Sequence, residues 1–156
     1  MSAISYAAWA FTAGALIPLM AILNGGLARE TGGAVQATVL LFAVGLLASL
    51  VAAATTKAHL PAIQTLARIS LPQYAGGLIV AFYILSITFI APRFGVGNAI
   101  LFAVTAQLLT SALIDHFALA GATLRPLTPM RAVGLLIVVV GVVITQVSDR
   151  VAPSAR

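Results

Sequence analysis

Five separate segments of about 20 predominantly apolar residues constrain the fold of this chain more than any other feature. A helix that crosses a bilayer needs roughly 20 such residues, at a rise of about 1.5 Å each. Of the 156 residues, 62% are apolar and 7% are charged, against about 25% charged in soluble domains. The sequence therefore predicts an all-α integral membrane protein. We expect one transmembrane domain over residues 1–156, with spans at about 4–28, 34–55, 73–91, 98–117 and 131–148.

The connectors between the spans predict the local turns. In 92–97 a proline stops one helix and two glycines permit a tight reversal, so the third and fourth spans should be antiparallel neighbours. Residues 61–69 begin with proline and repeat an apolar residue every third position, which indicates a short interfacial helix. Residues 118–130 should be irregular. The first apolar run has no preceding Lys or Arg, which favours a retained helix over a cleaved signal.

Eight Lys and Arg residues flank the spans and divide evenly between the two sides of a bilayer. One side receives Lys57, Arg68, Arg125 and Arg131, and the other receives Arg29, Arg93, Arg150 and Arg156. The positive-inside rule orients a protein through an excess of Lys and Arg on cytoplasmic loops, and this chain has no such excess. The sequence therefore predicts insertion in both orientations. Two oppositely inserted copies would form an antiparallel pair, as in transporters built from inverted halves.

The composition also excludes several classes of function. The basic residues are scattered singly, so the formal charge of +5 predicts contact with lipid headgroups and not with nucleic acid. The chain has no cysteine, and one Asp beside one His falls short of the three or four ligands of a metal site. No catalytic motif such as a P-loop is present. We therefore expect no enzyme activity, no metal and no cofactor.

The polar residues inside the spans are uncharged, because no Asp, Glu, Lys or Arg lies near the middle of a span. The candidate substrate-binding residues are Asn24, Tyr83, Ser86, Gln107 and Ser111. Gln107, Ser111 and Asp115 are spaced four apart and share one helix face. Such a face suits a hydrated pathway, or recognition of a polar or cationic solute. The alternative is interhelical hydrogen bonding, which contributes about 0.6 kcal/mol per pair.

Asp115 and His116 are candidate coupling residues at the end of the fourth span. Histidine titrates near pH 6.5, so the two residues suit a proton or ion relay. Adjacent side chains point about 100° apart on a helix, so they are not a simple pair. Alternatively, they mark a helix end at the headgroup level, with Asp115 meeting Arg125 or Arg131.

Small residues form one face of the second and fifth spans. The second span has Gly45, Ser49 and Ala53, and the fifth has Gly134, Val138, Gly141 and Thr145. Helices in lipid associate through such residues because their backbones can approach closely. These faces indicate either packing within one subunit or, along the fifth span, a seam between subunits.

Several motifs together resemble the YdcZ-type family of small bacterial inner-membrane proteins in the drug/metabolite transporter (DMT) superfamily. The similarity covers nearly the whole chain. It rests on Ala91-Pro92-Arg93-Phe94-Gly95, Gln107-Leu108-Leu109, Leu113-Ile114-Asp115-His116-Phe117, Asn24 with Leu27 and Arg29, and Arg125-Pro126-Leu127 before Gly134 and Gly141. The chain departs from the family pattern at Met20, where many relatives have Gln, and at Ala118, where Gly often follows.

The resemblance implies five helices equivalent to half of a ten-helix, inverted-repeat transporter of the bacterial inner membrane. By position, Asn24, Gln107, Asp115 and His116 match recurring polar residues of the family. We therefore expect a small-solute transporter, and more specifically an exporter, that works by alternating access as an antiparallel homodimer. The alternatives are an obligate subunit of a heterodimer with a sister chain, or a membrane scaffold or regulatory subunit that transports nothing.

Overall fold

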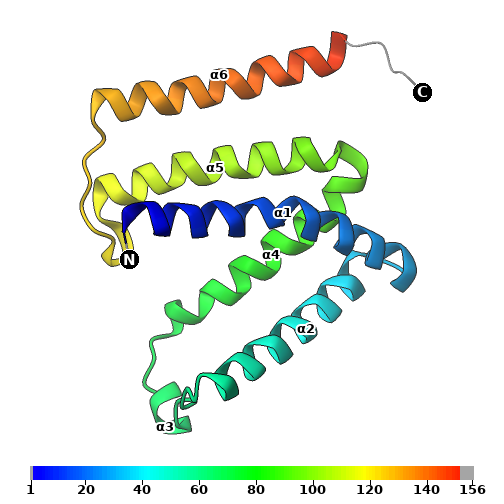
Figure 1. The fold of residues 1–156 in the computed structure, drawn as a ribbon, viewed down its shortest axis with the longest axis vertical. Coiled ribbons are helices and arrows are strands. Elements are labelled where there is room, and N and C mark those ends of the chain that lie inside the picture. Colours follow the sequence, from blue (N-terminus) through cyan, green and yellow to red (C-terminus); the bar gives the residue numbers. More distant parts are fainter. Residues whose placement is uncertain (1, 152–156) are drawn as a thin grey trace. The chain divides into compact units, whose positions relative to one another are not determined.

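The computed structural model describes residues 2–151, with the backbone alone for residues 149–151. Within this range every regular element is helical (Figure 1). The elements are α1 (Ala3–Thr31), α2 (Ala34–Thr55), α3 (Ile63–Leu66), α4 (Leu71–Phe94), α5 (Val96–Phe117), the short 3-10 helix η1 (Leu119–Gly121) and α6 (Pro129–Val151). Five of these helices, α1, α2, α4, α5 and α6, are long and apolar enough to cross a membrane. The predicted all-α fold with five spans is confirmed.

The predicted helix stop at Pro92 is wrong. Pro92 lies inside α4, which continues to Phe94, and the chain reverses at Gly95. Gly95 has φ 90°, a value that favours glycine, and its N–H donates to the carbonyl of Ala91 at 2.9 Å. Pro92 is tolerated because it costs a helix only one donor, the N–H that would bond to the carbonyl of Thr88.

The remaining connectors agree with the sequence pattern. The predicted short helix in residues 61–69 is a single turn, α3, and the hydroxyl of Tyr74 donates to the Leu66 carbonyl at 2.8 Å. Residues 118–128 are irregular except for η1. Gly32, at φ 91°, ends α1 and allows α2 to start three residues after Thr31. Of the flanking cations, Arg156 lies outside the described residues, and so does the side chain of Arg150.

The chain divides into two compact units, residues 1–96 and 97–156. In the N-terminal unit α1, α2 and α4 contact one another. Their buried residues lie where α1 ends, α2 begins and α4 ends: Ala21, Asn24 and Gly25 in α1, Ala37 and Thr38 in α2, and Ile84, Ile87, Thr88 and Ala91 in α4. From this common end α1 and α2 diverge (Figure 1). The three helices therefore pack at one end and splay at the other.

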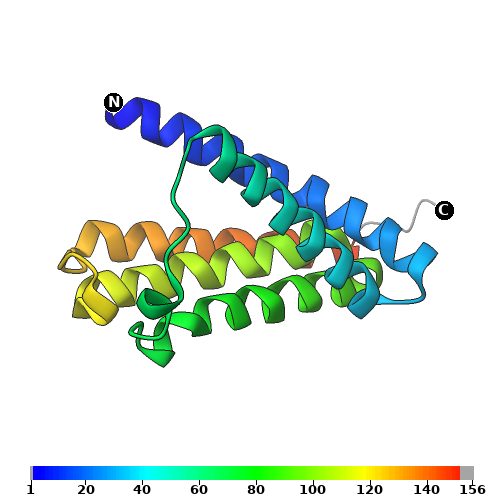
Figure 2. The same ribbon diagram turned by 90° about the horizontal axis from the view of Figure 1, so that it is seen from below.

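In the C-terminal unit α5 and α6 run side by side in opposite directions (Figure 2). Side-chain bonds join them at both ends. At one end Nε2 of Gln146 donates to Oδ1 of Asn98 at 2.8 Å, and at the other end Arg131 pairs with Asp115. Asn98 and Asp115 are about 25 Å apart along α5, at about 1.5 Å per residue, which approaches the thickness of the hydrocarbon core. That these helices and the N-terminal unit form one domain stays a prediction.

Candidate functional site

Three polar side chains are buried among the described residues, and all three belong to the N-terminal unit. Asn24 of α1 is 3% exposed, Thr38 of α2 is 4% exposed and Thr88 of α4 is 3% exposed. Each of the three helices that pack at the common end therefore contributes one buried polar group. A buried polar group in lipid is costly unless it is paired, so the pairing of these groups decides what the cluster can do.

The pairing of this cluster is incomplete. Nδ2 of Asn24 donates to the hydroxyl oxygen of Thr88, which links α1 to α4. Oδ1 of Asn24 and the hydroxyl of Thr38 are buried without a hydrogen-bond partner in the described part of the chain. Each such atom costs about 1–3 kcal/mol until a partner reaches it. The cluster therefore holds an unused acceptor and an unused hydroxyl.

Small residues allow the helices to approach closely around Asn24. Gly25 is buried, and a Cβ added there would lie 3.9 Å from the ring of Pro92 on α4. Ala21 on the preceding turn of α1 and Ala91 on α4 are also buried. These contacts place the Asn24 amide between helices, where a longer neighbouring side chain would hold them apart.

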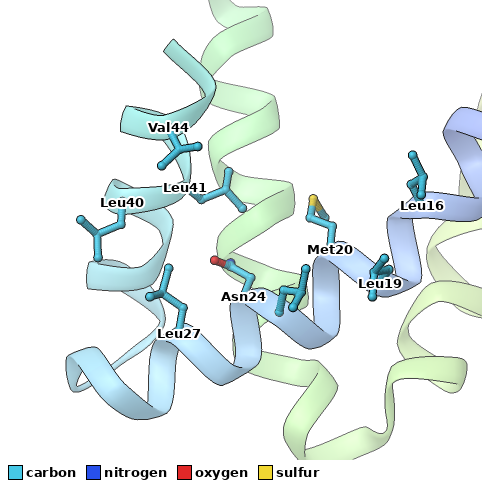
Figure 3. A pocket seen from close by; sticks show the side chains of 9 residues that line it. Leu16, Leu19, Met20, Asn24, Leu27, Leu40, Leu41 and Val44 are labelled. Atoms are coloured by element: carbon cyan, nitrogen blue, oxygen red, sulfur yellow. The ribbon is translucent and has the colours of Figure 1, made fainter. Parts of the chain in front are cut away.

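An apolar cleft of about 570 Å³ opens between α1 and α2, next to this cluster. Figure 3 shows the Asn24 amide extending from α1, with Met20 on the preceding turn and Leu27 on the following turn. The other lining residues are Leu16, Leu19, Leu23, Leu40, Leu41 and Val44. Asn24 is thus the single polar residue among the nine that line the cleft. No charged residue is among them.

The polar end of the cleft, at Asn24, lies nearer the C-terminal end of α1 than the apolar end does. Asn24 lies seven residues from the end of α1 at Thr31, about 10 Å along the axis, and Leu16 lies about 12 Å further along the helix. In a hydrocarbon core about 30 Å thick, the amide lies closer to one interface and the leucines extend toward the middle. The exposed charged residues at the interface end of α1 and α4 are Arg29, Glu30 and Arg93.

Of the other predicted substrate residues, Tyr83 and Ser86 lie on α4 in the same unit as Asn24. Both are half-buried, and neither bonds to Asn24 within the described residues. Asn24, predicted from the sequence, is thus joined by Thr88, and Thr38 lies on a helix in contact with theirs. Thr38 and Thr88 were not among the predicted site residues. Each is one hydroxyl residue in a largely apolar span, and that signal does not reveal burial.

Gln107 and Ser111 lie in the C-terminal unit, exposed on α5. The hydroxyl of Ser111 donates to the carbonyl of Leu108 in its own helix at 2.9 Å, so it is already satisfied. The Gln107 amide has no bond to another side chain in the described part of the chain. Gln107 is therefore free to meet a solute or a second protein surface.

Asp115 and His116 close the end of the α5–α6 pair. Oδ2 of Asp115 accepts from Nη2 of Arg131 at 2.7 Å, and the Asp115 carbonyl accepts from the Arg125 N–H at 2.9 Å. Nδ1 of His116 accepts from the Leu127 N–H at 2.9 Å. Both residues thus hold the 118–128 connector against α5. The expected meeting of Asp115 with Arg131 is confirmed.

The metal-ligating side chains do not cluster. Within residues 2–148, whose side chains are described, no group of three or more His, Cys, Asp or Glu residues could hold a metal ion.

Comparison with known proteins identifies one family. The family model DMT_YdcZ, described as "Putative inner membrane exporter, YdcZ", matches residues 5–144. This range covers α2, α4 and α5 completely and most of α1 and α6. No curated protein and no solved structure matches the chain.

Proposed function

Because the chain belongs to the DMT_YdcZ family of inner membrane exporters, which are transporters rather than enzymes, we propose that it exports a small solute by alternating access as an antiparallel homodimer. The observation that carries the proposal is the cleft of the N-terminal unit. A membrane-embedded cavity that is apolar along its length and ends at a buried amide suits reversible binding of a small molecule. A helix bundle that only supports a partner has no need of an unpaired buried acceptor.

Three features support the antiparallel pair. The described part of the chain contains five spans, half the number expected from the resemblance. Its Lys and Arg residues divide evenly between the two sides by sequence position. Gly134 and Gly141 of α6 have open space where a Cβ would stand, so this face of α6 is free to pack against a second copy.

Gln107, Asp115 and His116 have separate proposed roles. Gln107 contacts the solute, since its amide is exposed and has no partner side chain in the described part of the chain. Asp115 and His116 couple transport to proton or ion movement. Coupling requires that Asp115 exchange Arg131 for another cation, and that His116 release the N–H of Leu127.

A second candidate is an obligate subunit of a heterodimer, or a scaffold or regulatory subunit that transports nothing. The observation in its favour is that the middle of each span has no charged residue to couple transport to an ion gradient. A sister chain of fixed orientation would then supply the missing half and the charge.

Reconstitution and labelling test the proposal together. Purified protein in liposomes should give solute flux by itself, whereas flux only with a sister chain would favour the heterodimer, and no flux in either case would favour the scaffold. For topology, single cysteines at Thr123, in the connector before α6, and at Gln36, in the first turn of α2, lie at opposite ends of the spans and exploit the absence of native cysteine. In cells, each should be partly labelled by an impermeant thiol reagent. Labelling of one position alone would rule out dual orientation.

A further inference from the structure

We propose that the cleft between α1 and α2 binds an uncharged amphiphile, whose apolar body lies along Leu16, Leu23 and Leu41 and whose hydroxyl or N–H donates to Oδ1 of Asn24. This inference rests on the proposed export function and names its substrate class. It narrows the polar or cationic solute expected from the sequence to one class of molecule.

The Asn24 amide has an unpaired hydrogen-bond acceptor. Nδ2 donates one of its two N–H groups to Thr88, whereas Oδ1 has no hydrogen-bond partner in the described part of the chain, so the amide atom that is wholly unpaired is an acceptor. Oδ1 is screened from solvent, and a hydrogen bond formed there gains from the low local dielectric. A ligand that donates a hydrogen bond to Oδ1 removes the free-energy cost of burying this acceptor without a partner. A carboxylate, which only accepts, gains nothing at this atom.

The lining of the cleft carries no charge. The nine lining residues include no Asp or Glu to pair with a cation, and an unpaired buried charge is costly. The charged groups at the interface end are Arg29, Glu30 and Arg93, two positive and one negative, and all are exposed. A cation in the cleft therefore has no counter-ion among the lining residues. The three charged residues at the interface end carry a net positive charge, which also disfavours a cation.

The polar and apolar parts of the cleft lie at different depths along α1. The leucines extend toward the bilayer centre, and Asn24 lies about 10 Å from the interface end of α1. An amphiphile entering from the bilayer is oriented in the same way, with its donor toward the headgroups and its apolar body inward. Met20 stands beside the amide (Figure 3), and its unbranched, flexible side chain can move to admit the donor.

Pyrene probes test the class of ligand, because they share one apolar body and differ at the end of the chain. The four probes are 1-pyrenebutanol, butylpyrene, a pyrenebutyl-trimethylammonium salt and 1-pyrenebutyrate. Trp9 is the single tryptophan of the chain and lies two turns of α1 before Leu16, so energy transfer from Trp9 reports binding. Purified full-length protein in nanodiscs should give saturable transfer with the butanol. The other three probes should bind about ten-fold more weakly, the factor that corresponds to 1.4 kcal/mol.

Variants assign the effect to the cleft. Asn24→Leu should bring 1-pyrenebutanol down to the affinity of butylpyrene, whereas Ser49→Ala should change nothing. Ser49 is exposed on α2, and its hydroxyl bonds to the Gly45 carbonyl in its own helix. If Asn24→Leu fails to fold, judged by circular dichroism and elution as a single species, Leu41→Phe replaces it, because Phe adds no second tryptophan to the readout. By narrowing the cleft, Leu41→Phe should weaken binding of the butanol at least ten-fold.

Several results would overturn the inference. Equal or tighter binding of the cation or the carboxylate would refute an uncharged ligand, and equal binding of butylpyrene would refute the bond to Asn24. The absence of saturable transfer with every probe would mean that lipid chains or a second copy occupy the cleft. Binding without any liposome flux would remove the export function and keep the site. Flux that the bound butanol does not inhibit would keep the export function and show that the cleft is not where the exported solute binds.

Discussion

Nη2 of Arg131 lies 2.7 Å from Oδ2 of Asp115, and this contact fixes where α6 begins relative to the end of α5. The two side chains are 33% and 31% exposed, so water and salt weaken their attraction. The contact nevertheless joins residues on both sides of the connector. The hydrogen bond from the Leu127 N–H to Nδ1 of His116 holds the same connector.

The first prediction concerns the Asp115–Arg131 pair. A double-mutant cycle with Asp115→Asn and Arg131→Gln should give a coupling energy of about 0.5 kcal/mol, because the pair is partly exposed. Unfolding in mixed micelles measures it, and 0.5 M salt should reduce the coupling. If Asp115 also couples transport, Asp115→Asn removes the pH dependence of flux. An unchanged pH profile would leave it a structural role alone.

His116 is predicted to protect the connector through its acceptor nitrogen. In His116→Leu the Leu127 N–H loses its acceptor, at a cost of about 1 kcal/mol, and its hydrogen exchange should accelerate about five-fold. In His116→Asn the side-chain oxygen can accept the same N–H, so exchange should stay near that of the native protein. Equal exchange in both variants would show that the bond does not order the connector.

Thr88 and Thr38 allow the same substitution to be compared at two equally buried sites. Thr88→Val removes the partner of the Asn24 amide and should destabilise the protein by about 1–2 kcal/mol. Thr38→Val removes a hydroxyl that has no partner in the described part of the chain, so it should be neutral or stabilising. Unfolding in mixed micelles distinguishes them. A larger loss of stability in Thr38→Val than in Thr88→Val would mean that the Thr38 hydroxyl has a hydrogen-bond partner in the folded protein.

Gln107→Leu is predicted to abolish transport while assembly and stability are retained. Assembly and stability should be retained because the Gln107 amide is exposed on α5 and has no bond to another side chain in the described part of the chain. Transport should be lost because leucine cannot make the proposed polar contact with the solute. Ser111→Ala is the control, because the Ser111 hydroxyl bonds to its own helix and should be dispensable. Liposome flux and size-exclusion chromatography provide the measurements. Retained flux in Gln107→Leu would assign the residue to packing.

Ala118 is predicted to be a strained position. It has φ 49° at the end of α5, a left-handed conformation that disfavours a Cβ, and it stands where the related family often has glycine. Ala118→Gly should therefore stabilise the protein by about 0.5–1 kcal/mol. Ala122 has φ −64°, so Ala122→Gly should instead destabilise it by a similar amount. The same sign in both variants would contradict the strain.

The sequence by itself determined the five spans, because runs of about 20 apolar residues leave a chain in lipid few alternatives to helices. The sequence also identified Asn24 as a candidate substrate-binding residue, and it predicted that Asp115 meets Arg125 or Arg131. It could not determine that α4 continues through Pro92, because one lost donor is tolerated where Gly95 provides the turn.

Only the tertiary structure decided which polar side chains are buried. Asn24 and Gln107 are similar amides in similar apolar surroundings along the chain, yet Asn24 is enclosed and Gln107 is exposed. The difference arises because Gly25 and Ala91, 66 positions apart, let α1 and α4 pack closely around Asn24. Burial in a membrane helix depends on such contacts between distant small residues, and local sequence does not encode them.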